Sequence, residues 1–167
     1  MGIRNSTKFT NIRSFAKKYK ELDFSVIEAC LYLLGVGQAV GEAMDAHFAR
    51  HNLSRGRFSI LMSLLHKDGP LSPAELADSC AVSRATVTGL LDTLEQAQLI
   101  ARIHDTEDRR SLQVRLTPEG EEHLRKMLPE HYRRVAGMMQ ELTGEERTTL
   151  VALLEKIERG IPVVRDP

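Results

Sequence analysis

Hydroxyl and arginine side chains gather at the start of a predicted helix near the middle of the chain, at Ser83, Arg84, Thr86 and Thr88. Hydroxyl groups at a helix N-terminus hydrogen-bond to phosphates or to the edges of bases, and arginine neutralises phosphate. Gly89 beside them has no side chain, so the helix backbone could approach a duplex closely. The pattern predicts a face that contacts double-stranded DNA, in which Arg84 meets a phosphate and the hydroxyls meet base edges.

A second group of charged residues follows that helix. The polar segment 104–111 separates two short apolar runs, 99–103 and 112–116, and this pattern predicts a β-hairpin, or wing. An arginine at the tip of a wing fits the narrow minor groove of DNA, where the negative potential is strong. The basic candidates for DNA contact are Arg109 and Arg110 at the tip, and Arg102 on the first strand as a phosphate contact.

Two short helices must position the first group. Ser72, Pro73 and Glu75 have the types and spacing of a capping box with proline in the first helical turn, which predicts a helix over residues 72–80. A three-residue break follows, and a second helix starts at Ser83. Its apolar stripe has the spacing i, i+3, i+4, i+7. The stripe consists of Val87, Leu90, Leu91 and Leu94. Two such helices joined by a short turn predict a helix-turn-helix unit.

Longer helices are predicted on either side of this unit, over residues 22–50, over 54–66, from Thr117 to about Gln140, and from Thr143 onwards. The first is apolar on most of its sides, and such a helix must be buried on most of its sides. In a short chain a partner subunit is the expected cover. The fold class predicted is mostly α with a small β-hairpin wing. The domains predicted are a basic arm (1–20), a dimerisation region (21–50 and 118–162) and a winged helix-turn-helix domain (51–117).

In these residues the chain resembles the MarR family of bacterial winged-helix regulators. The resemblance extends over about residues 25–160 and is carried by three segments in order, Ser83 to Thr88, Asp108 to Arg110, and Leu116, Thr117, Pro118, Glu119 and Gly120. It implies a homodimer that binds a palindromic operator, with Arg110 in the minor groove and Asp108 orienting it. A repressor is the expected sense of regulation. The chain departs from the family pattern at Ala81 and Gln98, where glycine is frequent, and at Thr93, where arginine is frequent.

The resemblance also implies a cleft for a small effector between the dimerisation region and the DNA-binding domain, with a phenolic or other aromatic anion as the family expectation. An effector bound there would release the DNA. The residues that could line such a cleft are Tyr32, Phe58, Met62 and His66, and the alternative is that they belong to the core.

The two cysteines are not spaced as a disulfide framework, which suits a reducing cytoplasm. Cys80 is predicted to be a small core residue. Cys30 resembles the position at which one branch of the family senses organic hydroperoxides, so an alternative function is a thiol-based peroxide sensor. Leu34 stands where that branch has a tyrosine, and no cation nearby in the sequence would activate the thiol. Packing is therefore the favoured interpretation of Cys30.

Two further patterns in the sequence resemble ligand-binding sites. Gly35, Gly37 and Gly41 resemble a dinucleotide-binding loop, but their flanks keep a helical period and no βαβ unit follows, so we predict helix packing and no enzyme. His47 and His51 share a helix face and could chelate zinc. Without a third ligand we interpret them as exposed polar residues, and predict no metal and no cofactor. A module of the same fold that does not bind DNA remains a further alternative.

Net charge gives no indication of the partner, because 23 basic residues balance 23 acidic ones. Residues 1–20 carry six basic side chains and no acidic one, so this arm is either a disordered solubilising segment or a source of phosphate contacts. The sequence predicts no signal peptide and no run of about 20 apolar residues that could span a bilayer. We therefore expect a cytoplasmic protein without a membrane partner.

Overall fold

The computed structural model describes residues 23–67, 69–104 and 112–165. In chain order its elements are α2 (Phe24–Ala49), α3 (Arg55–Lys67), α4 (Pro73–Cys80), α5 (Arg84–Gln96), β1 (Ile100–His104), β2 (Leu112–Leu116), α6 (Pro118–Met138), α7 (Gly144–Gly160) and α8 (Pro162–Arg165). The predicted fold class is confirmed, since the protein is mostly helical with one small antiparallel hairpin.

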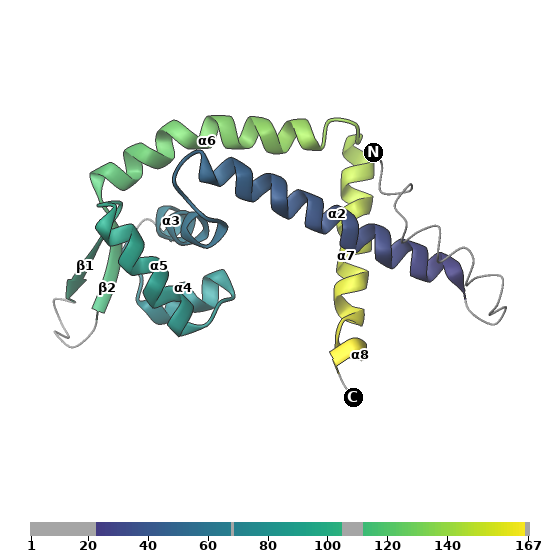
Figure 1. Ribbon diagram of the computed structural model, residues 1–167, viewed down its shortest axis with the longest axis horizontal. Coiled ribbons are helices and arrows are strands. Elements are labelled where there is room, and N and C mark those ends of the chain that lie inside the picture. The colour runs from purple at the N-terminus through teal and green to yellow at the C-terminus, as the bar shows by residue number, and fades with distance from the viewer. Residues whose placement is uncertain (1–22, 68, 105–111, 166–167) are drawn as a thin grey trace.

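One end of the molecule is a compact lobe built from α3, α4, α5 and the hairpin, and α2 and α6 extend away from it towards α7 (Figure 1). The lobe holds most of the core, because the apolar faces of its three helices meet the inner face of the hairpin. The side chains that are less than 2% exposed are Ile60, Leu61, Leu76, Leu91, Leu94, Ile100, Leu124, Met127, Val87 and Val114. The predicted stripe of α5 is confirmed in this core, with Leu90 partly buried against it.

The two strands of the hairpin pair with each other, and a pair of backbone hydrogen bonds from Leu71 attaches them to the helices of the lobe. Ile100 pairs with Leu116 and His104 with Leu112 in an antiparallel register. Leu71, directly before α4, adds a further bridge, since its N–H donates to the Val114 carbonyl at 2.9 Å and its carbonyl accepts from the Val114 N–H at 2.8 Å. The position of the wing is therefore tied to the start of α4.

The segment that joins β2 to α6 passes very close to Gln98 and Leu99, which precede β1. The Thr117 hydroxyl donates to the Gln98 carbonyl at 2.6 Å and accepts from the Gly120 N–H at 3.0 Å, which caps α6. Gly120 is buried, and a Cβ atom on it would lie 2.0 Å from the Leu99 carbonyl oxygen. Glycine is therefore the residue that this crossing requires.

Ala81 and Gln98 have left-handed backbones, with φ of 52° and 58°. These are the two positions where the resemblance leads one to expect glycine. Ala81 closes α4, and its N–H reaches the carbonyls of Ala77 and Asp78. An L-residue in this conformation brings its Cβ close to a carbonyl oxygen, at a cost of roughly 1–2 kcal/mol that glycine avoids.

We expect Ala81→Gly to raise the free energy of unfolding by about 1 kcal/mol, because it removes that steric conflict while keeping the hydrogen bonds of the turn. Urea denaturation followed by circular dichroism measures the change. Ala97→Gly is the matched control, since Ala97 is also an exposed helix cap but has a φ of −78°. It should lose roughly 0.5–1 kcal/mol. Equal changes in the two variants would contradict the strain at Ala81.

Helix α2 corrects the expectation that no segment could span a bilayer. It contains an 18-residue window that is long and apolar enough by composition, near the N-terminus, and none of that window is buried in the chain. One such helix is weak evidence of a membrane segment. The same helix encloses Gly35, Gly37 and Gly41, so these glycines form no phosphate-binding loop.

Helix α7 lies in the predicted dimerisation region and carries an apolar stripe. Thr143 and Glu146 form a capping box at its start. However, α7 has no buried residue, because nothing else in the described chain covers it. Its exposed apolar side chains include Leu150, Val151, Leu153, Leu154 and Ile157.

Candidate nucleic-acid interface

The helix-turn-helix is built by caps at the start of both of its helices. The capping box of α4 is confirmed, since the Ser72 N–H donates to Glu75 Oε2 at 2.8 Å and the Glu75 N–H donates to Ser72 Oγ at 3.2 Å. The Ser72 N–H and, after it, the Ser72 hydroxyl both donate to the Glu75 carboxylate, and these two bonds lower the pKa of Glu75. Ser83 caps α5 in the same way, because its Oγ accepts from the Thr86 N–H at 3.1 Å. The N-terminus of α5 is thereby held at the surface of the lobe.

The face of α5 that was predicted to meet DNA is open to solvent. Val87, Leu91 and Leu94 are buried, whereas the residues on the other side are exposed. The exposed residues are Ser83, Arg84, Ala85, Thr86, Thr88 and Gly89. The structure therefore brings four of the predicted DNA-contacting residues together on one accessible surface.

The hydroxyls on this surface already have partners within the helix. Ser83 Oγ and Thr86 Oγ1 lie 2.8 Å apart and share a hydrogen bond. Thr88 Oγ1 donates to the Arg84 carbonyl at 3.1 Å. Their remaining capacity is one hydroxyl proton of the Ser83–Thr86 pair and several oxygen lone pairs. The hydroxyls are thus better placed to accept hydrogen bonds from bases than to donate them.

Arg102, which was predicted to contact a phosphate, pairs with two carboxylates of its own chain. Its guanidinium donates to Asp92 Oδ1 and to Glu95 Oε2, both at 2.6 Å, and these two carboxylates lie on α5. The hydrogen bond to Asp92, together with the nearby Glu95, raises the pKa of Arg102. Because both of its terminal nitrogens are engaged, Arg102 holds β1 against α5.

Sequence reasoning overlooked the acidic partners of Arg102. Asp92 and Glu95 are three residues apart, which places them on one face of a helix. That spacing, followed by a basic residue on the next strand, was the available signal. The other predicted DNA contacts on the wing, Asp108, Arg109 and Arg110, lie outside the described residues, as does the basic arm.

The four residues predicted to line an effector cleft do not surround one cavity of this chain. Phe58 and Met62 pack against the core, and Phe58 stacks on Phe48 with ring centroids 4.5 Å apart. His66 lines a surface hollow beside Ser63 and Asp78. Tyr32 lines a different hollow with Ser25 and Glu28. At 1.5 Å per residue, Tyr32 is roughly 24 Å along α2 from Phe48.

The cysteines lie in different environments. Cys80 is partly buried and packs against the core, as predicted, with its sulfur 3.8 Å from the Ser63 hydroxyl. Cys30 is exposed on α2. Its role as a peroxide sensor stays a prediction.

The interpretation of His47 and His51 as exposed polar residues is wrong for His47, which is 3% exposed, and His51 is only partly exposed. The reason is that α6 covers this end of α2. The ring of His131 on α6 stacks on that of His47 with centroids 5.3 Å apart. Burial, followed by the charges of His131 and His51, lowers the pKa of His47.

Comparisons with known proteins agree with this geometry. The sequence profile of the MarR family matches residues 53–112, which covers α3 to the start of β2. The HTH-type transcriptional repressor YetL of Bacillus subtilis is 35% identical over 167 residues, which are 99% of this chain and all of YetL.

Solved structures show the same architecture. AbsC, a MarR family transcriptional regulator from Streptomyces coelicolor, superposes with a TM-score of 0.77 at 24% identity, over 84% of this chain and 97% of AbsC. BpsR of Bordetella bronchiseptica, whose DNA binding is regulated by 6-hydroxynicotinic acid, is 28% identical with a TM-score of 0.55, over 72% of this chain and 98% of BpsR.

Proposed function

The chain belongs to the MarR family of transcriptional regulators, and we propose that it is a homodimeric repressor that binds a palindromic operator and is released by a small ligand. In this proposal residues 51–117 form the DNA-binding domain, and residues 21–50 and 118–162 form the dimerisation region. A regulator of transcription acts on the chromosome, which places it in the cytoplasm of a bacterium.

The observation that carries the proposal is the exposed N-terminal half of α5. It presents Arg84 and short hydroxyl side chains to solvent, while its opposite face is anchored in the core. A slim helix of this kind fits the major groove, which admits one α-helix. A module that no longer bound DNA would have no need of this combination.

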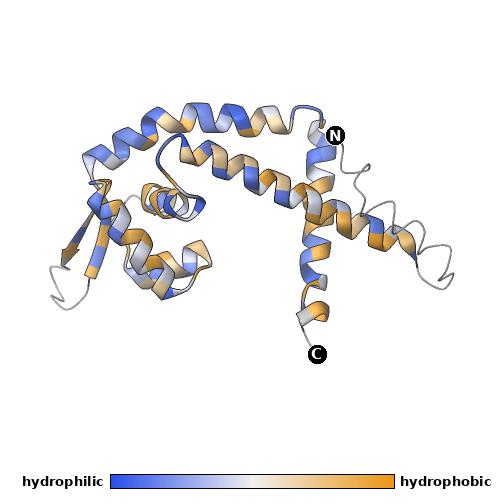
Figure 2. Ribbon diagram, in the orientation of Figure 1, coloured by the Kyte–Doolittle hydropathy of each residue, from blue (hydrophilic) through white to orange (hydrophobic). Residues whose placement is uncertain are grey.

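Dimerisation is supported by the apolar surface at the other end of the molecule. Figure 2 shows hydrophobic residues along the part of α2 beyond the lobe and along α7. Leu34 on α2 is 62% exposed, and Leu153 on α7 is 50% exposed. Exposed apolar surface of this extent marks an interface. A two-fold axis through such an interface would set the two α5 helices about one helical turn of DNA, roughly 34 Å, apart.

Release by an effector is supported by BpsR, whose DNA binding is regulated by 6-hydroxynicotinic acid. We propose an aromatic anion of similar size as the effector class here. Such a ligand acts only if it binds one spacing of the two α5 helices more tightly than the other. Since Tyr32 and Phe58 are far apart in one chain, a shared cleft would need Tyr32 from the partner subunit.

Selection of bound duplexes from a random pool tests the proposed function. The expected result is an enriched palindrome whose half-sites have centres 10–11 base pairs apart, or roughly one turn of DNA. Enrichment of a single unrepeated site, or of no sequence, would contradict a symmetric DNA-binding dimer.

We expect Arg110→Ala to weaken binding to that operator by roughly 1–3 kcal/mol, or about 5- to 150-fold, because it removes the proposed minor-groove contact. Fluorescence anisotropy at one fixed salt concentration measures the loss. Arg133→Ala is the control, since it removes an equal charge from an exposed site on α6. Equal affinities for Arg110→Ala and the unmodified protein would rule out the contact.

A further inference from the structure

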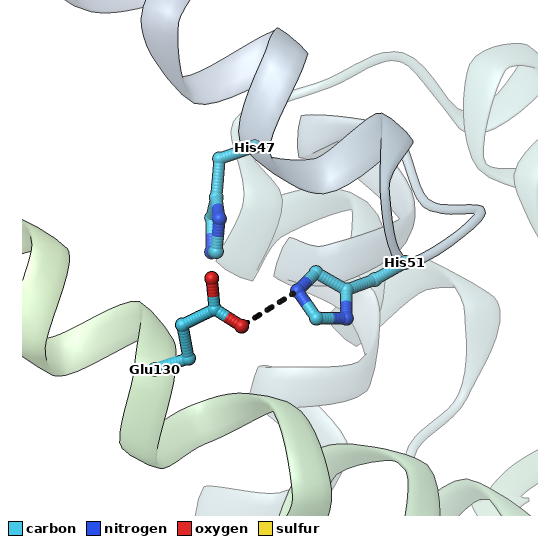
Figure 3. Close-up of side chains that lie close together, drawn as sticks. All are labelled: His47, His51 and Glu130. Atoms are coloured by element: carbon cyan, nitrogen blue, oxygen red, sulfur yellow. Dashed lines mark ion pairs between the residues drawn. The ribbon is translucent and has the colours of Figure 1, made fainter.

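Two histidines and a glutamate converge where α2 meets α6. His47 lies in the last turn of α2, His51 follows that helix, and Glu130 lies on α6. Figure 3 shows the two imidazole rings and the carboxylate facing a common space from the two helices. One ligand atom from each of the three residues lies within 4.8 Å of the other two. The third ligand that the sequence did not reveal is therefore Glu130.

One ring nitrogen of each histidine in this cluster has no hydrogen-bond partner. Nε2 of His47 and Nε2 of His51 are both buried and unpartnered, and the His47 side chain is 3% exposed. Buried polar atoms nearly always have a partner, so these two ring nitrogens beside one carboxylate are available to bind a ligand. The contact between His51 Nε2 and Glu130 Oε2 is 3.9 Å, which is too long for a hydrogen bond.

The distances between the ligand atoms of these three residues suit a bound metal ion better than direct hydrogen bonds. With ligand bonds of about 2.0–2.2 Å, a tetrahedral zinc ion holds its ligand atoms roughly 3.3 Å apart. The ligand atoms, which lie within 4.8 Å of one another, need to approach by only about 1.5 Å to reach this distance. Glu130 is free to do so, because its side chain is 39% exposed.

The outer contacts of the cluster leave the inward-facing atoms available. Glu130 Oε1 accepts from Arg134 at 2.7 Å, which leaves Oε2 for the ion. An outer partner of this kind orients a ligating carboxylate. His47 Nδ1 lies 3.2 Å from an Arg50 nitrogen. Binding of an ion at Nε2 would place the ring proton on Nδ1. The Arg50 side chain, which is exposed, must then move away from Nδ1.

We propose that His47, His51 and Glu130 form a binding site for one divalent transition-metal ion, with zinc as the preferred ion. Two imidazoles and one carboxylate favour zinc over calcium and magnesium, which prefer oxygen ligands. Three protein ligands leave a fourth position for water or for a small anion. The ion would join the end of α2 to α6, next to the segment that leads into α3.

Zinc titration of the full-length protein, after treatment with a chelator, tests the site by competition with a chromophoric chelator. We expect one zinc ion per chain with a Kd of about 1 μM or tighter. Glu130→Gln and His51→Gln should each weaken binding at least 100-fold, and the visible absorption of bound cobalt(II) should fall with them. Circular dichroism shows whether each variant is folded.

Glu122→Gln is the matched control. Glu122 is another glutamate of α6 that pairs with an arginine, its side chain is 40% exposed, and it lies outside the cluster. Its variant should bind zinc within threefold of the unmodified protein. A Kd weaker than about 10 μM for the unmodified protein, or a loss below tenfold in the folded Glu130→Gln variant, would overturn the site.

Discussion

Gly120→Ala is expected to lower the free energy of unfolding by at least about 3 kcal/mol, which is at the upper end of the effects of overpacking. A Cβ atom at this position would lie 2.0 Å from the Leu99 carbonyl oxygen, and its two nearest neighbours are backbone atoms of Leu99. Relief requires α6 to move away from the chain before β1. That movement would break the bond from Thr117 to the Gln98 carbonyl and loosen the wing. Chemical denaturation of the purified variant measures the effect.

Gly137→Ala is the control for this experiment. It lies near the end of the same helix, and a Cβ atom there would meet nothing within 4 Å. The replacement should be neutral or stabilising by roughly 0.5–1 kcal/mol, because alanine favours a helix over glycine. A loss below about 1 kcal/mol in Gly120→Ala would mean that the backbone at this crossing adjusts without strain.

Ile157→Glu should convert the proposed dimer into a monomer and reduce operator affinity by at least 100-fold. Ile157 is 48% exposed in the apolar stripe of α7. In a symmetric dimer the substitution buries two unpaired carboxylates, at a cost of several kcal/mol for each. A monomer binds one half-site and loses the 10²–10⁴-fold gain of linked binding. Sedimentation velocity and fluorescence anisotropy measure the two effects.

Ala152→Glu provides the matched control for Ile157→Glu. Ala152 is exposed on the opposite side of α7, so the same charge is added to the same helix outside the stripe. This variant should remain dimeric and bind the operator normally. A dimeric Ile157→Glu variant with full affinity would show that the stripe of α7 is not the interface.

Local signals predicted the elements of this fold well. Capping boxes at Ser72 and Thr143 specify helix starts by hydrogen bonds between residues three apart, and both starts were correct. The hairpin followed from two short branched runs, and its register matches those runs. The exposed face of α5 followed from its apolar stripe, because a helix that buries one side must expose the other.

Contacts between distant segments were not predictable in the same way. Arg102 looked like a free cation until the fold placed Asp92 and Glu95 beside it. His47 and His51 looked exposed because their cover, α6, begins about 70 residues further along the chain. The cover of the α7 stripe was not predictable either, because apolar periodicity cannot tell whether the same chain or a second copy covers it.

Two sets of contacts inside the lobe fix the hairpin relative to the helix-turn-helix. Arg102 locks β1 to α5, and the bridge of Leu71 to Val114 locks β2 to the start of α4. With these contacts in place, α4, α5 and the hairpin are held together as one rigid unit. Any change in the spacing of two such lobes would therefore move each α5 helix together with its hairpin.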